Sequence, residues 1–106
     1  MEMYRVGNET AILLSVGFGA GWSTWNQKAL AYDKRIIEYW NPCGLHPSVE
    51  QMEKYLEKLG YKGVYMGGYE ELRIEWVPTG SLVRINEYDG AERIEVLSPD
   101  KDWIQT

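Results

Sequence analysis

The sequence predicts an α+β fold in which an antiparallel β-sheet carries two helices packed on one face. Two turn pairs, Gly7-Asn8 and Asp89-Gly90, each separate runs of strand-forming residues. Between them, two segments place apolar side chains at helical spacing. At 106 residues the chain has the length of one domain, so we expect residues 1–106 to form a single domain.

The first expected element is an N-terminal hairpin. Residues 3–6 and 10–16 have the character of two strands, and Gly7-Asn8 between them suits a tight turn. The second of these strands contains the apolar run from Ala11 to Val16. We therefore expect the two segments to pair antiparallel.

Two helices are expected in the middle of the chain. Residues 30–40 show helical spacing, and the segment 41–44 (Asn-Pro-Cys-Gly) ends it. Ser48 and Gln51 form a capping box that begins the second helix, and Gly60 favours its end. This helix carries one apolar stripe: Val49, Met52, Leu56 and Leu59.

The C-terminal part predicts a short strand and then a three-stranded meander. Residues 61–68 are expected to form a short strand that ends in a loop, and residues 72–97 the meander. Pairing outward from Asp89-Gly90 sets opposite one another Tyr88/Ala91, Asn86/Arg93, Ile85/Ile94, Arg84/Glu95 and Val83/Val96. Pairing outward from residues 78–81 does the same for Val77/Leu82, Trp76/Val83, Glu75/Arg84, Ile74/Ile85 and Arg73/Asn86. The two registers agree, with one apolar and one polar face.

Residues 17–26, here called the glycine–tryptophan segment, are the first candidate binding site. Their glycines permit close backbone approach, and Trp22 and Trp25 add flat surface with an indole N–H each. Their N–H groups can form an anion-binding nest, and a tryptophan can stack on a base. The spacing of glycines fits neither a dinucleotide fingerprint nor a Walker A loop. The alternative is a tight strand-to-helix connection with both indoles packed inward.

A polar row on the expected meander is the second candidate site. Arg73, Asn86 and Arg93 would lie side by side across three strands, without a carboxylate in their own row. Guanidinium groups bind phosphates and carboxylates, and an asparagine binds an amide or a base edge. The alternative is a solvated sheet face on which the arginines pair diagonally with Glu75 and Glu95.

Composition and charge narrow the classes of partner. The net charge of −5 and a pI near 4.8 argue against direct binding to a nucleic-acid backbone. No apolar run has the length that spans a bilayer, so no membrane partner is expected. Cys43 is the only cysteine, which excludes an internal disulfide and favours a reducing cytoplasm. Five Trp and eight Tyr against one Phe favour binding surfaces, or a core filled by large rings.

We expect no catalytic residue, no cofactor and no metal. Cys43 and His46 lie close together in a proline-flanked loop, but two ligands do not complete a zinc site. Asp and Glu are plentiful, and nothing singles out a pair of carboxylates for acid–base catalysis.

Several stretches together resemble a group of short uncharacterised proteins encoded by bacteriophages and prophages. They are residues 19–25 (GAGWSTW), 67–68 (GG), 74–78 (IEWVP) and 87–92 (EYDGAE). The resemblance covers most of the chain and implies a phage origin, with action in the cytoplasm of a bacterial host. It implies no catalytic or binding residue.

The leading hypothesis is a non-enzymatic phage counter-defence protein, a sponge that sequesters a nucleotide-derived immune signalling molecule. Tryptophans or Tyr88 would stack on the base, the arginines and loop N–H groups would bind phosphates, and an asparagine would bind the sugar or base. The candidate ligand-binding residues are Phe18, Gly19, Gly21, Trp22, Trp25, Asn26, Arg73, Asn86, Tyr88 and Arg93. We also expect a homo-oligomer that associates through exposed aromatic side chains.

Two other hypotheses stay open. The first is an anti-CRISPR-type inhibitor that binds a host defence protein through an acidic surface made of Glu50, Glu53, Glu57, Glu70 and Glu71. The second is a small nucleotide hydrolase, for which no nucleophile or metal set is visible in the sequence.

Overall fold

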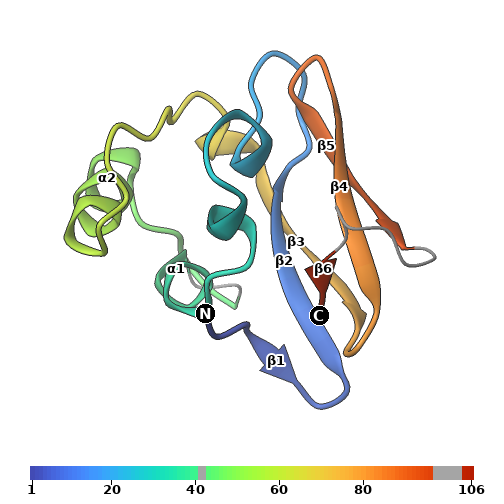
Figure 1. Ribbon diagram of the computed structural model, residues 1–106. Helices are drawn as coiled ribbons and strands as arrows, with labels where there is room; N and C mark the ends of the chain where they lie inside the picture. The colour runs from blue at the N-terminus through green and yellow to red at the C-terminus, as the bar shows by residue number, and fades with distance from the viewer. Residues whose placement is uncertain (41–42, 97–103) are drawn as a thin grey trace.

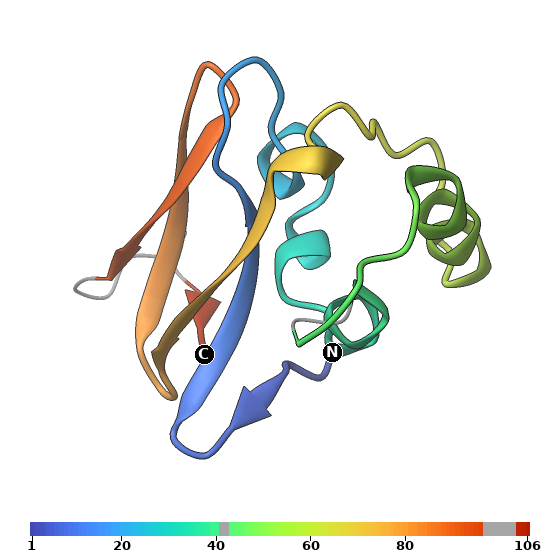
Figure 2. The ribbon, with the colours of Figure 1, turned by 180° about the vertical axis from the view of Figure 1, so that it is seen from behind.

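The computed structural model describes residues 1–40, 43–96 and 104–106, which fold into three layers (Figure 1). Helices α1 (Lys34–Trp40) and α2 (Val49–Lys58) form the first layer. The second layer is a sheet of β1 (Arg5–Val6), β2 (Glu9–Ser15) and β3 (Leu72–Pro78). The third is a sheet of β5 (Ala91–Val96), β4 (Leu82–Tyr88) and β6 (Ile104–Gln105). The α+β class, with antiparallel sheets and the helices on one face, is confirmed, and the view from behind shows the same order of layers (Figure 2).

Strand β2 is the centre of the fold. The N-terminal hairpin is confirmed, because Arg5 pairs with Thr10 and Val6 with Glu9 across the Gly7-Asn8 turn. Every residue from Thr10 to Ser15 is buried, since one face of β2 contacts the helices and the other contacts the second sheet. A strand covered on both faces needs apolar side chains on both, which explains the continuous run that begins at Ala11.

Of the two strand pairings predicted for the meander, one is confirmed and one is wrong. The pairing of β4 with β5 is the predicted one, from Tyr88 opposite Ala91 to Val83 opposite Val96. Strand β3, however, pairs with β2, and the predicted pairing of β3 with β4 is wrong. The turn between them does form, with the Ser81 N–H donating to the Pro78 carbonyl at 3.1 Å. The chain uses this turn to cross from one sheet to the other, which gives β2 a long partner and places Val83 between the sheets. Residue 97, the predicted end of the meander, lies outside the described residues.

The first predicted helix is divided. Residues Lys28–Ala31 form a 3₁₀ turn, η2, and α1 begins only at Lys34. The division falls at Asp33, whose Oδ1 accepts the Arg35 backbone N–H at 3.0 Å, as a helix N-cap does. The predicted break at 41–44 includes residues 41–42, which lie outside the described residues.

The second predicted helix is confirmed at both ends. Ser48 and Gln51 form the capping box of α2, and Gly60 follows the helix with a φ of 99°. Residues 61–68 lead into a 3₁₀ turn, η3 (Tyr69–Glu71), without the predicted strand. A third 3₁₀ turn, η1 (Ser23–Trp25), lies within the glycine–tryptophan segment.

Candidate functional site

The N–H groups of the glycine–tryptophan segment converge on one carboxylate of the protein itself. Glu92 of β5 is 4% exposed, and its Oε2 accepts the backbone N–H groups of Trp22 at 2.8 Å and Thr24 at 3.0 Å. The Thr24 hydroxyl donates to the same oxygen at 2.5 Å, and Oε1 accepts the N–H of Ser15 at 2.9 Å. The predicted anion nest is therefore present, and Glu92 occupies it. Those N–H groups are not available to a phosphate, which corrects the role expected for them.

Close backbone contacts fix the same segment in place. The Gly19 N–H donates to the Asp89 carbonyl at 2.6 Å. A Cβ added at Gly90 would overlap the backbone of Ala20, and one added at Gly68 would lie 2.7 Å from the Gly21 carbonyl oxygen. Residues 19–25, 67–68 and 87–92, three of the stretches on which the expected phage resemblance depends, thus pack against one another.

The two tryptophans of the segment lie in opposite environments. Trp22 is fully buried, and its Nε1 donates to the Leu30 carbonyl at 3.0 Å. The prediction that Trp22 stacks on a ligand base is therefore wrong. Trp25 is 42% exposed, stacks on Tyr65 with ring centres 5.9 Å apart and donates to Glu87 at 3.2 Å. The hydrogen bonds from the Gly90 N–H and then from the Trp25 indole lower the pKa of Glu87.

The three-residue polar row does not form. Asn86 and Arg93 lie opposite each other on β4 and β5, but Arg73 pairs with Leu14 in the other sheet. The expectation that Arg73 and Arg93 bind one phosphate together is wrong, because it depended on the pairing of β3 with β4. Of the neighbouring charged row, the pair Arg84 and Glu95 is present, with Nη2 and Oε2 3.6 Å apart.

The remaining predicted residues divide between exposed and committed side chains. Phe18, Tyr88 and Arg93 are exposed, and Gly21 is buried where an added Cβ would lie 2.6 Å from the Trp25 ring. Asn26 is committed to the protein: its Nδ2 donates to the carbonyls of Trp22 at 2.8 Å and Tyr65 at 3.0 Å, and its Oδ1 accepts the Tyr65 N–H at 2.8 Å. Hydrogen bonding of Asn26 to a ligand sugar or base is therefore not supported.

A cavity of about 420 Å³ lies beside this segment. Strand β6 pairs with β4 only at Leu82 and Val83, and the cavity begins at the next two residues of β4. The volume is within the range of small-molecule sites, about 300–1,000 Å³. Its lining residues are Ser23, Thr24, Asn26, Lys28, Tyr32, Arg84, Ile85 and Ile104.

The lining combines positive charge, hydroxyl groups and apolar surface. Lys28 makes no ion pair within the described part of the chain, and Arg84 shares its charge with Glu95. Tyr32 is 3% exposed, and its hydroxyl makes no hydrogen bond to any described residue. Burial, and then the charge of Glu92, raises the pKa of Tyr32 to about 12, so this hydroxyl stays protonated and can donate at neutral pH.

Of the ten predicted residues, only Asn26 lines this cavity, although Ser23 and Thr24 belong to the predicted segment. The sequence offered one missed signal: Lys28 and Tyr32 are four residues apart, a spacing that places side chains on one face of a helical turn. Their partners Arg84 and Ile104 are remote in sequence, and only the tertiary fold brings them near.

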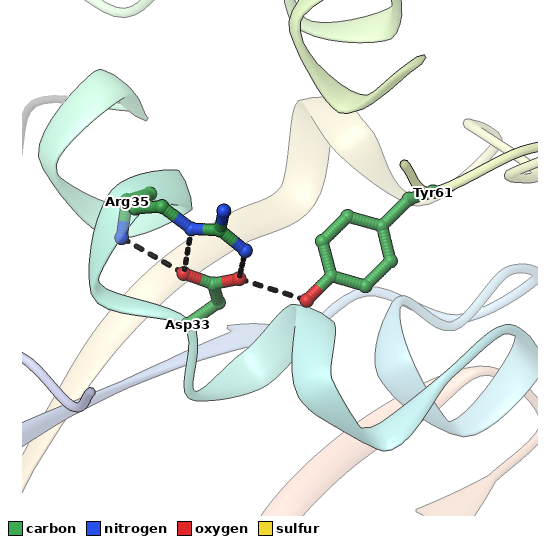
Figure 3. A network of polar contacts seen from close by, with 3 residues as sticks. All are labelled: Asp33, Arg35 and Tyr61. Carbon is green, nitrogen blue, oxygen red and sulfur yellow. Dashed lines mark hydrogen bonds and ion pairs between the residues drawn. The ribbon is translucent and has the colours of Figure 1, made fainter. Parts of the chain in front are cut away.

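A charged network around the buried Asp33 joins the first helix to the loop after α2 (Figure 3). Asp33 accepts hydrogen bonds from Arg35 Nε at 3.1 Å and Nη2 at 2.7 Å, and from the Tyr61 hydroxyl at 2.8 Å. Burial acts to raise the pKa of Asp33, but the hydrogen bonds from Arg35 and Tyr61 and the Arg35 charge outweigh it, so the pKa lies below its ordinary value. All acceptor sites face protein donors, which makes this network a cross-link of the fold.

Cys43 and His46 lie between α1 and α2. Cys43 is exposed, while His46 stacks on Trp40 and its Nδ1 lies 2.8 Å from the Trp40 carbonyl oxygen. A second hollow of about 350 Å³ lies beside this stack. Within residues 1–40, 43–96 and 104–106, no three His, Cys, Asp or Glu side chains are grouped so that they could hold a metal ion.

The five glutamates of the proposed acidic surface are all exposed. Glu50, Glu53 and Glu57 lie on α2, and Glu70 and Glu71 on η3. The exposed lysines Lys54 and Lys58 lie among the first three, so α2 presents both signs of charge.

None of the helices in the described ranges is long and apolar enough to cross a membrane. The chain matches no protein-family model, and no curated protein or solved structure is significantly similar to it.

Proposed function

We propose that this protein is a non-enzymatic binding protein that sequesters a nucleotide-derived signalling molecule in the cavity lined by Lys28, Tyr32 and Arg84. The observation that carries the proposal is the make-up of this cavity. It combines a lysine that no described acid neutralises, a tyrosine hydroxyl that bonds to no described residue and two isoleucines that add apolar surface.

Each part of a nucleotide has a chemical counterpart in the lining. Lys28 and Arg84 suit phosphate oxygens, because charge-assisted hydrogen bonds to phosphate are strong and guanidinium groups can bind them with two donors. Tyr32, Ile85 and Ile104 provide a surface for a flat base. The hydroxyl of Ser23 lines the same space and suits a ribose oxygen, whereas the Thr24 hydroxyl, which donates to Glu92, can only accept a hydrogen bond from the ligand.

The biological setting of the proposal comes from the resemblance to phage and prophage proteins. In that setting the protein would act in the host cytoplasm as a counter-defence sponge, which lowers the free concentration of an immune signal. Such a function requires binding alone, and we propose no chemical step.

The test is a panel of cyclic, oligomeric and ADP-ribose-type nucleotides, measured by isothermal titration calorimetry with the full chain. Binding of one class, with the ligand recovered intact by mass spectrometry after denaturation, supports the sponge. Recovery of a cleaved product points to the hydrolase. If no nucleotide of the panel binds and a host defence protein co-purifies with the chain, the inhibitor hypothesis is favoured.

A further inference from the structure

Strand β3 forms an open edge of the central sheet. It pairs with β2 along its whole length, and no described strand pairs with its other side. Figure 2 shows β3 running across the front of the molecule from η3 to the turn before β4. An unpaired strand edge is a template for pairing with another chain, and small proteins usually cover or interrupt it.

The side chains of this edge strand are also unusually open. Arg73, Glu75 and Trp76 are exposed, although they belong to a strand of the middle layer. Neither Arg73 nor Glu75 forms an ion pair with a described residue. The strand therefore presents one positive and one negative charge, two residues apart on one face, beside a row of backbone groups that no described strand pairs.

The order of these residues makes the strand complementary to itself. If two copies pair antiparallel with Ile74 opposite Ile74, then Arg73 of each copy lies opposite Glu75 of the other. On the other face of the sheet, Leu72 lies opposite Trp76, and all contacts are apolar. Centring the pair on Arg73 or on Glu75 would instead place like charges opposite each other.

Symmetry strengthens this choice of register. A two-fold axis perpendicular to a sheet leaves each side chain on the face it started on. Residues that lie directly opposite each other share a face, so the axis must relate a residue to its own copy and cannot lie between two neighbouring residues. Among the residues Arg73, Ile74 and Glu75, only Ile74 as the centre brings opposite charges together on both sides of the axis.

We propose that two copies of this chain pair through β3, antiparallel and centred on Ile74, to form one continuous sheet. The proposal is independent of any ligand in the cavity, since β3 contributes no residue to its lining. The same edge is then covered by an identical strand, and the charges of Arg73 and Glu75 are neutralised by the partner copy.

Sedimentation velocity of the full chain over a concentration series tests the pairing. The wild type should show a dimer that dissociates on dilution. Arg73→Glu and Glu75→Arg should each weaken self-association at least tenfold, because each brings like charges together at two places. The double variant R73E/E75R should restore it, since the charges are exchanged and remain complementary.

Sedimentation velocity of an equimolar mixture of the two single variants tests the proposed register most directly. One variant then carries two acidic side chains on the strand and the other two basic ones, so a heterodimer should form where neither variant dimerises alone. Arg5→Glu and Glu9→Arg make the same charge changes elsewhere in the sheet and should leave association unchanged.

Circular dichroism checks that each variant is folded, and the neutral pair Arg73→Gln and Glu75→Gln replaces any variant that is not. Those neutral variants should weaken association less than the reversals and should show no recovery on mixing. A wild type that stays monomeric at millimolar concentration overturns the proposal. A dimer that the reversals leave intact overturns it too, and places the interface on another surface.

Discussion

Glu92 accepts the backbone N–H of Trp22 at 2.8 Å, although the two residues are 70 positions apart in the chain. The same side chain reaches Ser15 at the end of β2 and Thr24 in η1. One buried carboxylate therefore joins the last long strand to the central strand and to the segment that walls the cavity. Its hydrogen bonds hold the shape of that wall.

Replacing Glu92 by Gln should destabilise the fold by about 1–3 kcal/mol, the range for a buried polar group left without its hydrogen-bond partner. The amide nitrogen of glutamine would face the backbone N–H groups that now donate to Glu92. At least one of these N–H groups would therefore lose its acceptor. Urea denaturation monitored by tryptophan fluorescence measures the change. Glu87→Gln, on the same hairpin but exposed, should have a clearly smaller effect. Equal losses for both variants would show that burial of Glu92 contributes nothing.

The cavity proposal predicts which lysine matters for ligand binding. Lys28→Ala should weaken binding of the best nucleotide of the panel about tenfold or more, because a phosphate loses a charged partner. Lys62→Ala, an exposed lysine outside the lining, should bind as the wild type does. Calorimetric titration of the wild type and the two variants measures the affinities. If K28A binds the nucleotide as tightly as the wild type does, the ligand does not bind in this cavity.

The hydroxyl of Tyr32 provides a second measure of the same site. Tyr32→Phe keeps the ring against the cavity and removes only the donor, so affinity should fall severalfold with little loss of stability. Since the pKa of Tyr32 is raised to about 12, its contribution to binding should be constant from neutral pH into the mildly alkaline range. Arg93→Ala, which removes a charge from the row expected on sequence grounds, should leave affinity unchanged. If Arg93→Ala lowered the affinity and Tyr32→Phe did not, the ligand site would lie on the outer face of β4 and β5.

Stability at low pH should depend on Asp33. The pKa of this carboxyl is lower in the folded than in the unfolded chain, so its ionisation adds stability above the unfolded value of about 3.9. That contribution is lost as the pH falls through the folded value. Asp33→Asn should therefore be less stable than the wild type at neutral pH and should lose less on acidification. Urea titrations at neutral and acidic pH measure both slopes, with the exposed Glu38→Gln as the control. Parallel pH profiles of D33N and the wild type would assign the acid sensitivity to other groups.

Two turn glycines allow the cost of backbone strain to be separated from the cost of a steric clash. Gly80 and Gly90 have φ values of 95° and 88°, so alanine is strained at both, by about 1–2 kcal/mol. Around Gly80 an added Cβ meets nothing within 4 Å, whereas at Gly90 it overlaps the Ala20 backbone. Gly90→Ala should therefore lower the melting temperature more than Gly80→Ala, in thermal denaturation followed by circular dichroism. A larger loss for G80A would mean that the segment around Ala20 yields easily.

Much of the fold could be predicted from interactions between residues that are close in sequence. The capping box at Ser48, the Asp89-Gly90 turn and the register of β4 with β5 depend on neighbours in sequence, and all three are confirmed. The partner of β3 does not depend on neighbours. A strand with alternating apolar residues shows the same pattern whether it pairs beside β4 or stacks across from it. Only the burial of β2 on both faces distinguishes these arrangements, and that burial is a tertiary property.

The candidate site was harder to predict for the same reason. A glycine-rich segment indicates close approach but does not identify what approaches, and here it is Glu92. One signal was present in the alternation of β5, since Glu92 shares its face with Ile94. A glutamate on the apolar face of a strand predicts a buried, hydrogen-bonded carboxylate.

The order in which a ribosome releases this chain gives the Glu92 contact a further meaning. The glycine–tryptophan segment leaves the exit tunnel long before β5 exists, and until then only water can satisfy its converging N–H groups. Contacts between remote parts of a chain form late and slow the folding rate. The cavity wall is thus not held in place until β5 has been synthesised, so the proposed ligand site forms only after that strand has left the tunnel.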